Sequence, residues 1–260
     1  MTSGSKKYTR SLLQKGMRED GRNLDQYRDI KIEYSVSAKS AEGSARVKIG
    51  ETEVVAGVKM DIGSPFPDRP DEGTIIVNTE LLPMSSPEFE TGPPSVNSIE
   101  ISRVVDRGIR ESKTMDFKKL CIKEREKIWM VFIDIYPIND AGNLFDAAAL
   151  AAFAALKDAR FPKYDEKTET IKYEEKTKTP ITLEKSPMAC TVWKIGDKFI
   201  VDPTSKEKEA ADARITTVSL EDGNICAMQK GGDSPLTAEE ITQMVDIGLT
   251  KAKELRKLFK

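Results

Sequence analysis

Three arginines lie on one side of a segment that has the pattern of an amphipathic helix. At 3.6 residues per turn, Arg103, Arg107 and Arg110 fall within roughly 60° of one another. Apolar residues lie on the opposite side: Ile101, Val104, Val105, Gly108 and Ile109. Because guanidinium groups bind phosphate through paired hydrogen bonds, this arginine stripe could hold successive phosphates of a nucleic-acid strand. The alternative is a solvated face paired with the neighbouring acids, and spacing alone favours that alternative.

A second candidate is the turn Asp140-Ala-Gly-Asn143, which leads into an apolar, alanine-rich segment. A helix N-terminus preceded by glycine can bind an anion through its backbone N–H groups. The sequence has no P-loop and no G-x-G-x-x-G pattern, and Asn143 is also suited to capping a helix. Capping is the favoured role for this turn.

A third candidate is an acidic segment that contains Asp202, Glu207, Glu209 and Asp212. Carboxylate oxygens are the ligands that Mg²⁺ prefers. Lysines at 206 and 208 interleave with these acids and reduce the local negative field. A solvated acidic loop is therefore favoured over a metal site.

The composition excludes several classes of chemistry. None of the 260 residues is histidine, so histidine bases, histidine triads and histidine-ligated zinc are absent. The three cysteines form no C-x-x-C pair, which favours neither a zinc ribbon nor a disulfide framework. A formal charge of −2 means that any anion-binding site must be local. The chain has no spanning apolar run and no signal peptide, so we expect a cytoplasmic protein with no membrane contact.

The elements that must position these candidates form two series of strands followed by helices. An amphipathic arm at 5–17 precedes four β-rich runs, which predict an antiparallel meander: 30–35, 45–49, 53–62 and 74–82. Asn97 and Glu100 are spaced as a helix cap and its partner, so a helix is expected from there to about Ser112. The nearly continuous apolar run 127–137 predicts a central strand, and 143–159 predicts a helix buried on most sides.

The second series follows a stretch of alternating Lys, Glu and Thr. Four short strands are expected at 188–195, 198–202, 214–220 and 224–230, and then a helix that begins at Thr237, where Glu240 completes a capping box. We predict an α+β fold of two similar βα halves. The expected divisions are an arm (1–28), a first half (29–162), a charged ribbon or linker (163–186) and a second half (187–260).

Several motifs, in order and correctly spaced over nearly the whole chain, resemble those of the RNase PH family. They are Arg18-Glu-Asp-Gly-Arg22, Ala41-Glu-Gly-Ser-Ala-Arg46 with its following strand, and Arg103-Val-Val-Asp-Arg-Gly-Ile-Arg110. Within that family, Gly73-Thr-Ile-Ile-Val-Asn and Val201-Asp-Pro-Thr204 most resemble the ring subunit of the archaeal exosome that is described as non-catalytic.

The resemblance implies a duplicated βα fold of the ribosomal protein S5 domain-2 type. It also implies a hetero-hexameric ring, a trimer of dimers with a catalytic RNase PH-like subunit, and an S1/KH-type RNA-binding cap. In such a ring, single-stranded RNA is shortened from its 3′ end by inorganic phosphate, and Mg²⁺ is a further candidate requirement of the complex. The helix that matches the one expected from Asn97 to about Ser112 faces the RNA path in this family, so the resemblance makes Arg103, Arg107 and Arg110 candidates for RNA binding.

Two departures from the active pattern predict that this chain has no catalytic residues, metal site or bound cofactor of its own. Active members have hydroxyl-bearing residues in the phosphate-binding turn, whereas this chain has Ala141-Gly142-Asn143-Leu144. Active members also have two Asp six residues apart, whereas here only Asp212 has a clear counterpart. We therefore expect a non-catalytic, RNA-binding ring subunit of a 3′→5′ exoribonuclease complex.

Two alternatives remain open at this point. The chain could itself be an active RNase PH-type phosphorolase that uses Asp212 with Glu207 or Glu209 as the second acid. It could also be a free-standing RNA-binding scaffold with no ring.

Overall fold

The larger sheet holds most of the first half of the chain. In the computed structural model, which describes residues 3–259, six strands form this sheet, five of them in the order β1-β2-β3-β6-β4, with β5 paired to β6. The bounds are β1 Ile30–Tyr34, β2 Gly43–Ile49, β3 Thr52–Gly63, β4 Thr74–Thr79, β5 Cys121–Lys123 and β6 Lys127–Asn139. Strand β6 lies inside the sheet, as its apolar sequence predicts.

The predicted four-strand meander is wrong at its fourth strand. Strands β1, β2 and β3 pair antiparallel in chain order, but β4 does not pair with β3. Instead β6 lies between them, antiparallel to β3 and parallel to β4. Parallel neighbours need a long crossover, and residues 80–126, which include a helix, supply it. Sequence spacing revealed the strand but not its neighbour.

The smaller sheet has the order β10-β9-β11-β12, with every pair antiparallel. Its strands are β9 Met188–Ile195, β10 Lys198–Val201, β11 Ala213–Ser219 and β12 Ile225–Gly231. Strand β9 is buried at every position except Lys194. A strand that is buried on both faces requires covering layers on both sides.

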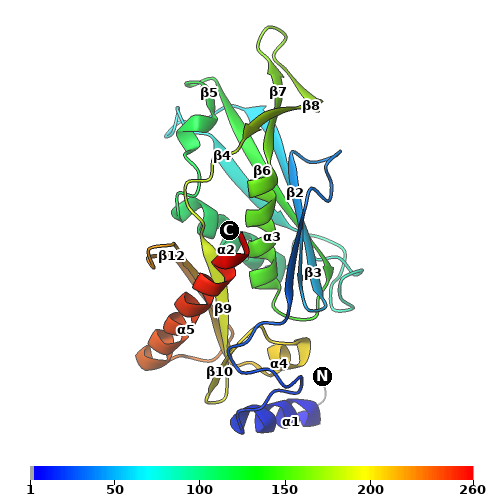
Figure 1. Ribbon diagram of the computed structural model, residues 1–260, viewed down its shortest axis with the longest axis vertical. Helices are drawn as coiled ribbons and strands as arrows, with labels where there is room; N and C mark the ends of the chain where they lie inside the picture. Colours follow the sequence, from blue (N-terminus) through cyan, green and yellow to red (C-terminus); the bar gives the residue numbers. More distant parts are fainter. Residues whose placement is uncertain (1–2, 260) are drawn as a thin grey trace.

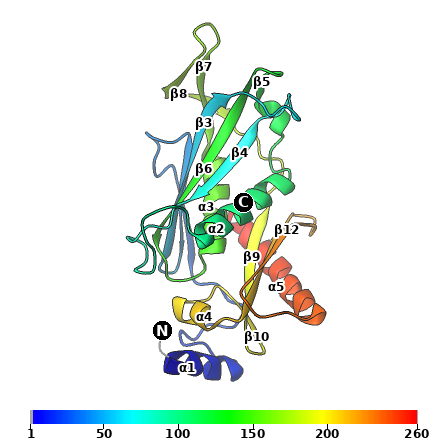
Figure 2. The ribbon, with the colours of Figure 1, turned by 180° about the vertical axis from the view of Figure 1, so that it is seen from behind.

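Three long helices provide these layers, as Figures 1 and 2 show. Helices α2 (Val96–Glu111) and α3 (Leu144–Asp158) lie between the two sheets, and α5 (Ala238–Arg256) covers the outer face of the smaller sheet. Helix α3 contacts β2, β3 and β9, and its small residues permit that close approach. A Cβ atom on Gly43 of β2 would lie 2.4 Å from the backbone oxygen of Ala155, so glycine is required there. The duplicated α+β fold is confirmed.

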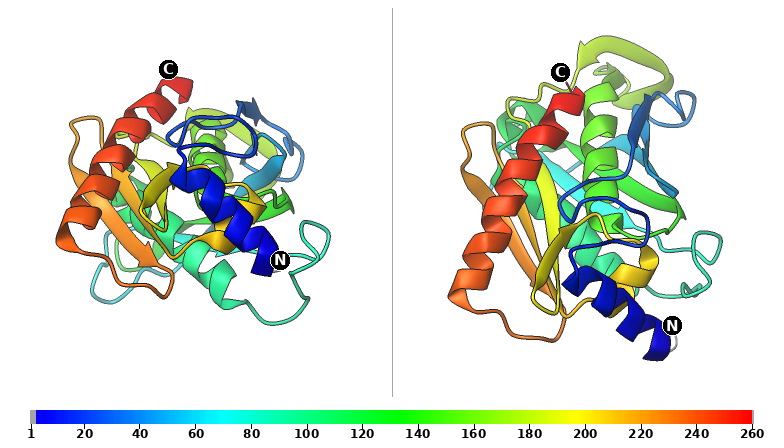
Figure 3. Two further views of the ribbon diagram at one scale, coloured as in Figure 1. Left: turned by 90° about the horizontal axis from the view of Figure 1, so that it is seen from below. Right: turned by 60° about the horizontal axis from the view of Figure 1, so that its bottom comes forward.

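The shorter elements lie at the two ends of the molecule. Helix α1 (Ser3–Gln14) packs against α4 (Ser205–Ala210) at one end, and the hairpin of β7 (Arg160–Asp165) and β8 (Thr170–Pro180) projects from the other (Figures 1 and 3). Two 3-10 turns span Phe117–Leu120 and Lys257–Phe259. Among residues 3–259, no helix is both long and apolar enough to cross a bilayer.

Two helix starts test the capping arguments. The capping box of Thr237 and Glu240 is present as predicted. The predicted Asn97 cap is wrong, because Ser95 caps α2 by accepting a hydrogen bond from the backbone N–H of Ser98. Asn97 lies inside the first turn, where its side chain is exposed.

Candidate nucleic-acid interface

Helix α2 presents its arginines because its other face is buried. The buried residues are Ser98, Ile101, Val104, Val105, Gly108 and Ile109. They pack on β4, α3 and β12, so the helix is held on three sides. At Gly108 the helix approaches β11 closely, with Val218 side-chain carbons 3.4 Å from where a Cβ would lie. The direction in which the arginine stripe faces is therefore fixed by the core.

Arg103 and Arg107 are exposed on the open side of α2. Neither side chain has a hydrogen bond or ion pair within residues 3–259. Two of the three acids that flank the stripe in the sequence are engaged elsewhere, since Glu100 pairs with Arg214 and Asp106 pairs with Arg110. The third, Glu111, is exposed and forms no ion pair with either arginine. The two guanidinium groups are one helical turn apart, about 6 Å along the axis. They form a local positive site on a chain of nearly neutral charge.

Arg110 differs from the other two arginines of the stripe. Its Nε and Nη2 atoms donate to the carboxylate of Asp106 at 3.1 and 2.8 Å, and Nη2 also donates to the backbone oxygen of Ile75 at 2.9 Å. The guanidinium lies 5.9 Å from the ring centroid of Phe117. Its donors therefore join α2 to β4, whereas those of Arg103 and Arg107 remain available.

The turn at 140–143 directs its polar groups inward. The backbone N–H of Gly142 donates to the carboxylate of Asp140, and that of Ala141 donates to the hydroxyl of Thr52. Gly142, with φ of 97°, lies so close to residues 203–205 that a Cβ would meet the backbone oxygen of Pro203 at 2.2 Å. An anion would have to displace the Asp140 carboxylate from this turn.

Asn143 caps α3 through its backbone position only. Its φ of 61° is left-handed, and its side chain makes no capping hydrogen bond. Instead Nδ2 donates to the carboxylates of Asp146 and Asp202, at 3.0 and 3.1 Å. The residue therefore links two buried acids, a role that the sequence did not reveal.

The acidic segment is cross-linked by arginines. Asp202 is fully buried and accepts hydrogen bonds from Arg22, Arg28 and Asn143. Glu207 accepts from Nε and Nη2 of Arg18, at 2.9 and 2.6 Å. Arg18 and Arg22 belong to the amino-terminal motif and Arg28 follows it, so the carboxylates attach that segment to the second half.

Asp212, the expected counterpart of a catalytic acid, is occupied in the same way. Its carboxylate accepts from Arg10 at 2.6 Å and from the backbone N–H of Gly196 at 2.7 Å. Partial burial opposes its ionisation, but these two donors outweigh that effect and hold the pKa of Asp212 below its ordinary value. A general acid needs the opposite shift. Within residues 3–259, no group of three or more Asp, Glu or Cys is arranged to hold a metal ion.

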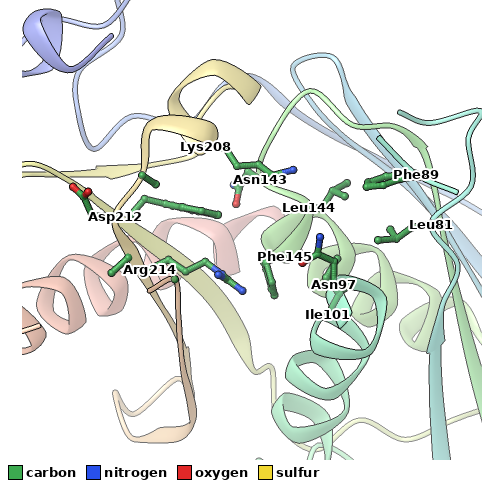
Figure 4. Close-up of a pocket in the computed structure, with 14 residues that line it drawn as sticks. Leu81, Phe89, Asn97, Ile101, Asn143, Leu144, Phe145, Lys208, Asp212 and Arg214 are labelled. Carbon is green, nitrogen blue, oxygen red and sulfur yellow. The ribbon is translucent and has the colours of Figure 1, made fainter. Parts of the chain in front are cut away.

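A pocket of about 240 Å³ joins two of the three sequence candidates, the turn before α3 and the acidic segment, to the helix that carries the arginine stripe (Figure 4). Its lining residues come from α2, from the turn before α3 and from the acidic segment: they include Asn97, Ile101, Asn143, Leu144, Lys208 and Asp212. On the α2 helical wheel, Asn97 and Ile101 lie about 120° and 160° from Arg103. The pocket and the exposed arginines are therefore on different sides of the same helix.

A buried polar network beneath this pocket was not predicted. Asp146 accepts hydrogen bonds from Tyr27, Thr191 and Asn143, at 2.6, 2.7 and 3.0 Å. Burial raises its pKa to about 7, although these donors oppose the shift. The available signal was a single aspartate in the first turn of a helix whose other residues are apolar as far as Leu156.

The fold and these motifs correspond to one family. The 3′ exoribonuclease family matches in both of its domains, domain 1 over residues 26–162 and domain 2 over residues 185–251. The chain belongs to the 3′ exoribonuclease, or RNase PH, family.

Among curated proteins it is similar to exosome complex component Rrp42. The protein from Methanothermobacter thermautotrophicus is 46% identical over 96% of this chain and 92% of its own length. The protein from Methanosarcina acetivorans is 47% identical over 98% of this chain and 92% of its own length.

Two solved structures are also similar to this chain. A chain of the Archaeoglobus fulgidus exosome with RNA bound to the active site matches with a TM-score of 0.91 and 43% identity, over 98% of both chains. Rice Rrp46 matches with a TM-score of 0.68 and 19% identity, covering 92% of this chain and 97% of that one, which supports the fold alone.

Proposed function

We propose that this chain is a non-catalytic ring subunit of an exosome, a phosphorolytic 3′→5′ exoribonuclease complex, and that it binds single-stranded RNA through Arg103 and Arg107. The observation that carries the proposal is a contrast in charge. These two guanidinium groups are exposed and unpaired within the described chain, whereas Asp202, Glu207 and Asp212 are all held by arginines.

The arginine pair suits an RNA backbone better than a base. Guanidinium contacts with phosphate position a strand without reading its sequence. Two such contacts one helical turn apart support sequence-tolerant binding that weakens as salt rises. The similarity to a chain of the Archaeoglobus fulgidus exosome with RNA bound to the active site gives this inference an RNA-containing relative.

The same proposal holds that this chain has no phosphate-binding or catalytic site of its own. A phosphate site in the turn at 140–143 would compete with the internal carboxylate of Asp140. An acid or metal ligand at Asp212 would have to leave Arg10. Inorganic phosphate and any Mg²⁺ are therefore assigned to the catalytic RNase PH-like partner.

The proposed assembly follows from the relatives, which are named as exosome components. In it, three copies of this chain alternate with three catalytic subunits, S1/KH-type cap proteins bind one face, and the complex works in the cytoplasm. The role of this chain is to complete the partner's RNA path.

The test measures phosphate-dependent shortening of a 5′-labelled single-stranded RNA by this chain, by its catalytic partner and by the mixture. We expect no activity from this chain alone and more from the mixture than from the partner. Activity from this chain alone would contradict the non-catalytic assignment. No association with the partner in sedimentation would instead favour a free-standing RNA-binding protein.

A charge-reversal pair then tests the arginines. Arg103→Glu with Arg107→Glu should reduce RNA binding and turnover of the mixture by at least about tenfold without dissociating the ring. The matched control is Arg125→Glu with Lys167→Glu, which makes the same change in charge in the turn between β5 and β6 and in the turn of the β7–β8 hairpin. Equal effects of the two pairs would contradict a specific role for α2.

A further inference from the structure

Arg103 has an acidic neighbour on its own helix that could neutralise it. Glu100 precedes Arg103 by three residues, so the two side chains leave α2 about 60° apart around the helix axis. Oppositely charged side chains at this spacing form ion pairs on helices, and the pair is favoured when the acid comes first. Such a pair would occupy a guanidinium group that the proposed function requires to be free.

The structure pairs Glu100 with Arg214 of β11 instead. Nη2 of Arg214 lies 2.5 Å from Oε2 of Glu100, and the two side chains are 12% and 23% exposed. A partly buried pair is screened less by water and salt than an exposed pair on a helix surface. The carboxylate of Glu100 is therefore held against β11 and does not pair with Arg103 in the described chain.

The position of Arg214 is determined by its surroundings in the second half of the chain and in α3. Its guanidinium carbon lies 4.3 Å from the ring centroid of Phe145 and 5.4 Å from that of Trp193. On the neighbouring strand it faces Gly231, where a Cβ atom would lie 2.0 Å from Nη1 of Arg214. Figure 4 shows the side chain extending from β11 towards Phe145 and α2. These contacts place the guanidinium where the Glu100 carboxylate meets it.

The other acids beside the arginine pair compete less well for it. Asp106 follows Arg103 and is already paired one turn further along α2. Glu111 follows Arg107 by four residues, which is the less favourable order on a helix, and it forms no ion pair with that arginine. Glu100 is thus the acid best placed to compete with an RNA phosphate for Arg103.

We infer that Arg214 is a positioning residue for RNA binding: it holds the carboxylate of Glu100 against β11 and so keeps Arg103 free for a phosphate. The inference rests on the proposed function, because it concerns the same arginine pair. It makes the RNA-binding helix of the first half depend on a residue of the second half. Arg214 acts through Glu100 and not by contact with RNA.

A rescue experiment tests this role. Affinity for single-stranded RNA is measured by fluorescence anisotropy at several salt concentrations, in the assembled ring and with the chain alone. Arg214→Gln should weaken binding by at least roughly threefold and reduce the slope of log K against log salt by up to about 0.7, because the released Glu100 neutralises Arg103. Adding Glu100→Gln to Arg214→Gln should restore both the affinity and the slope.

Two further variants separate this role from a loss of stability. Lys194→Gln breaks an ion pair between β9 and Glu240 of α5 whose side chains are 16% and 25% exposed, but it releases no acid of α2. It should lower the melting temperature about as much as Arg214→Gln does and leave RNA affinity unchanged. Arg214→Lys keeps a charge that can pair with Glu100, so it should cause a smaller loss than Arg214→Gln, and Glu100→Gln should reverse that loss as well. Arg214→Lys also serves as the test variant if Arg214→Gln does not fold.

The outcomes distinguish the inference from the proposed function. A double variant that stays as weak as Arg214→Gln would overturn the inference, because either a purely structural role or direct contact of Arg214 with RNA would give that result. Unchanged binding in folded Arg214→Gln would overturn it too. If Arg103→Glu with Arg107→Glu bound RNA as the parent does, the proposed function itself would fail.

Discussion

The open side of α2 and the arginine-rich amino-terminal segment use the same residue type for opposite purposes. Arg103 and Arg107 are exposed and have no partner in the described chain. Arg18 and Arg22 are nearly or fully buried and bind Glu207 and Asp202. Buried charges are tolerated only when paired, so the second group is structural. An exposed arginine is free to meet a ligand.

Because of this difference, a motif that resembles the family does not by itself mark a binding site. The amino-terminal motif has paired arginines, and the unpaired arginines lie on α2. The amino-terminal motif is one of those that resemble the family, yet its arginines bind carboxylates of the second half and so stabilise the joint between the two halves. The helix motif combines both roles, because Arg110 is occupied while its two neighbours on the stripe are not. An arginine that has no partner within the described chain is available to bind RNA, whereas an arginine that is already paired stabilises the fold. The residue type alone does not distinguish the two roles.

The largest expected effect comes from removing a buried acid of the paired region. Asp202→Asn should lower the free energy of unfolding by about 3–5 kcal/mol, because it leaves Arg22 and Arg28 without their shared carboxylate. The melting temperature should fall by roughly 10 °C in a thermal scan. Asp197→Asn, which breaks only an exposed pair with Lys198, should cost less than about 1 kcal/mol. Similar losses for the two variants would remove the distinction between paired and open regions.

The next effect concerns pH and the network below the pocket. Burial raises the pKa of Asp146 in the folded chain to about 7, against an ordinary value of 3.8, so the folded chain keeps a proton that the unfolded chain releases. This contribution to stability is complete below about pH 4 and is lost as pH rises to 7, by about 4 kcal/mol.

In the Asp146→Asn variant, the free energy of unfolding should no longer fall between about pH 4 and pH 7. The measurement is urea unfolding of both chains between pH 4 and 8. Asp134→Asn, on the outer face of the larger sheet, provides the matched control and should follow the parent profile. A parallel decline in Asp146→Asn would show that another group is responsible.

A salt titration sharpens the role of the exposed pair. Arg103→Ala with Arg107→Ala should reduce the slope of log K against log salt for single-stranded RNA by about 1.4, since each lost phosphate contact contributes about 0.7. Fluorescence anisotropy at several salt concentrations measures the slope in the assembled ring. Arg125→Ala with Lys167→Ala should leave it unchanged, and an unchanged slope in the α2 variant would show that neither arginine meets a phosphate.

Local sequence signals predicted elements well but not their long-range partners. The capping box at Thr237 is present as predicted, and the same pattern at Thr204 and Glu207 starts α4, which we did not predict. The pairing of Arg18 with Glu207 spans 189 residues, and no local pattern encodes it. No local pattern encodes the position of β6 between β3 and β4 either, because it depends on pairing between strands that are far apart in the sequence.

The candidate site could be predicted only in part, because some of its contacts join residues that are far apart in the sequence. Helical spacing identified the arginine stripe because all three residues share one helix. It could not distinguish Arg110, whose partner Ile75 lies on a strand 35 residues away. The pocket combines α2, the turn before α3, β9 and β11, so its existence depended on the tertiary fold.

The smallest effect separates the arginines of the stripe from one another. Arg110→Ala should lower the free energy of unfolding by about 1–2 kcal/mol, because it removes the bonds to Asp106 and to the Ile75 backbone. Arg103→Ala should stay within about 0.5 kcal/mol of the parent chain, since its side chain has no partner in the described structure. RNA affinity, measured on the same two variants by anisotropy, should show the reverse order. If Arg110→Ala weakened RNA binding more than Arg103→Ala, Arg110 would have to leave Asp106 when RNA binds, and the separation between open and paired arginines would not hold along this helix.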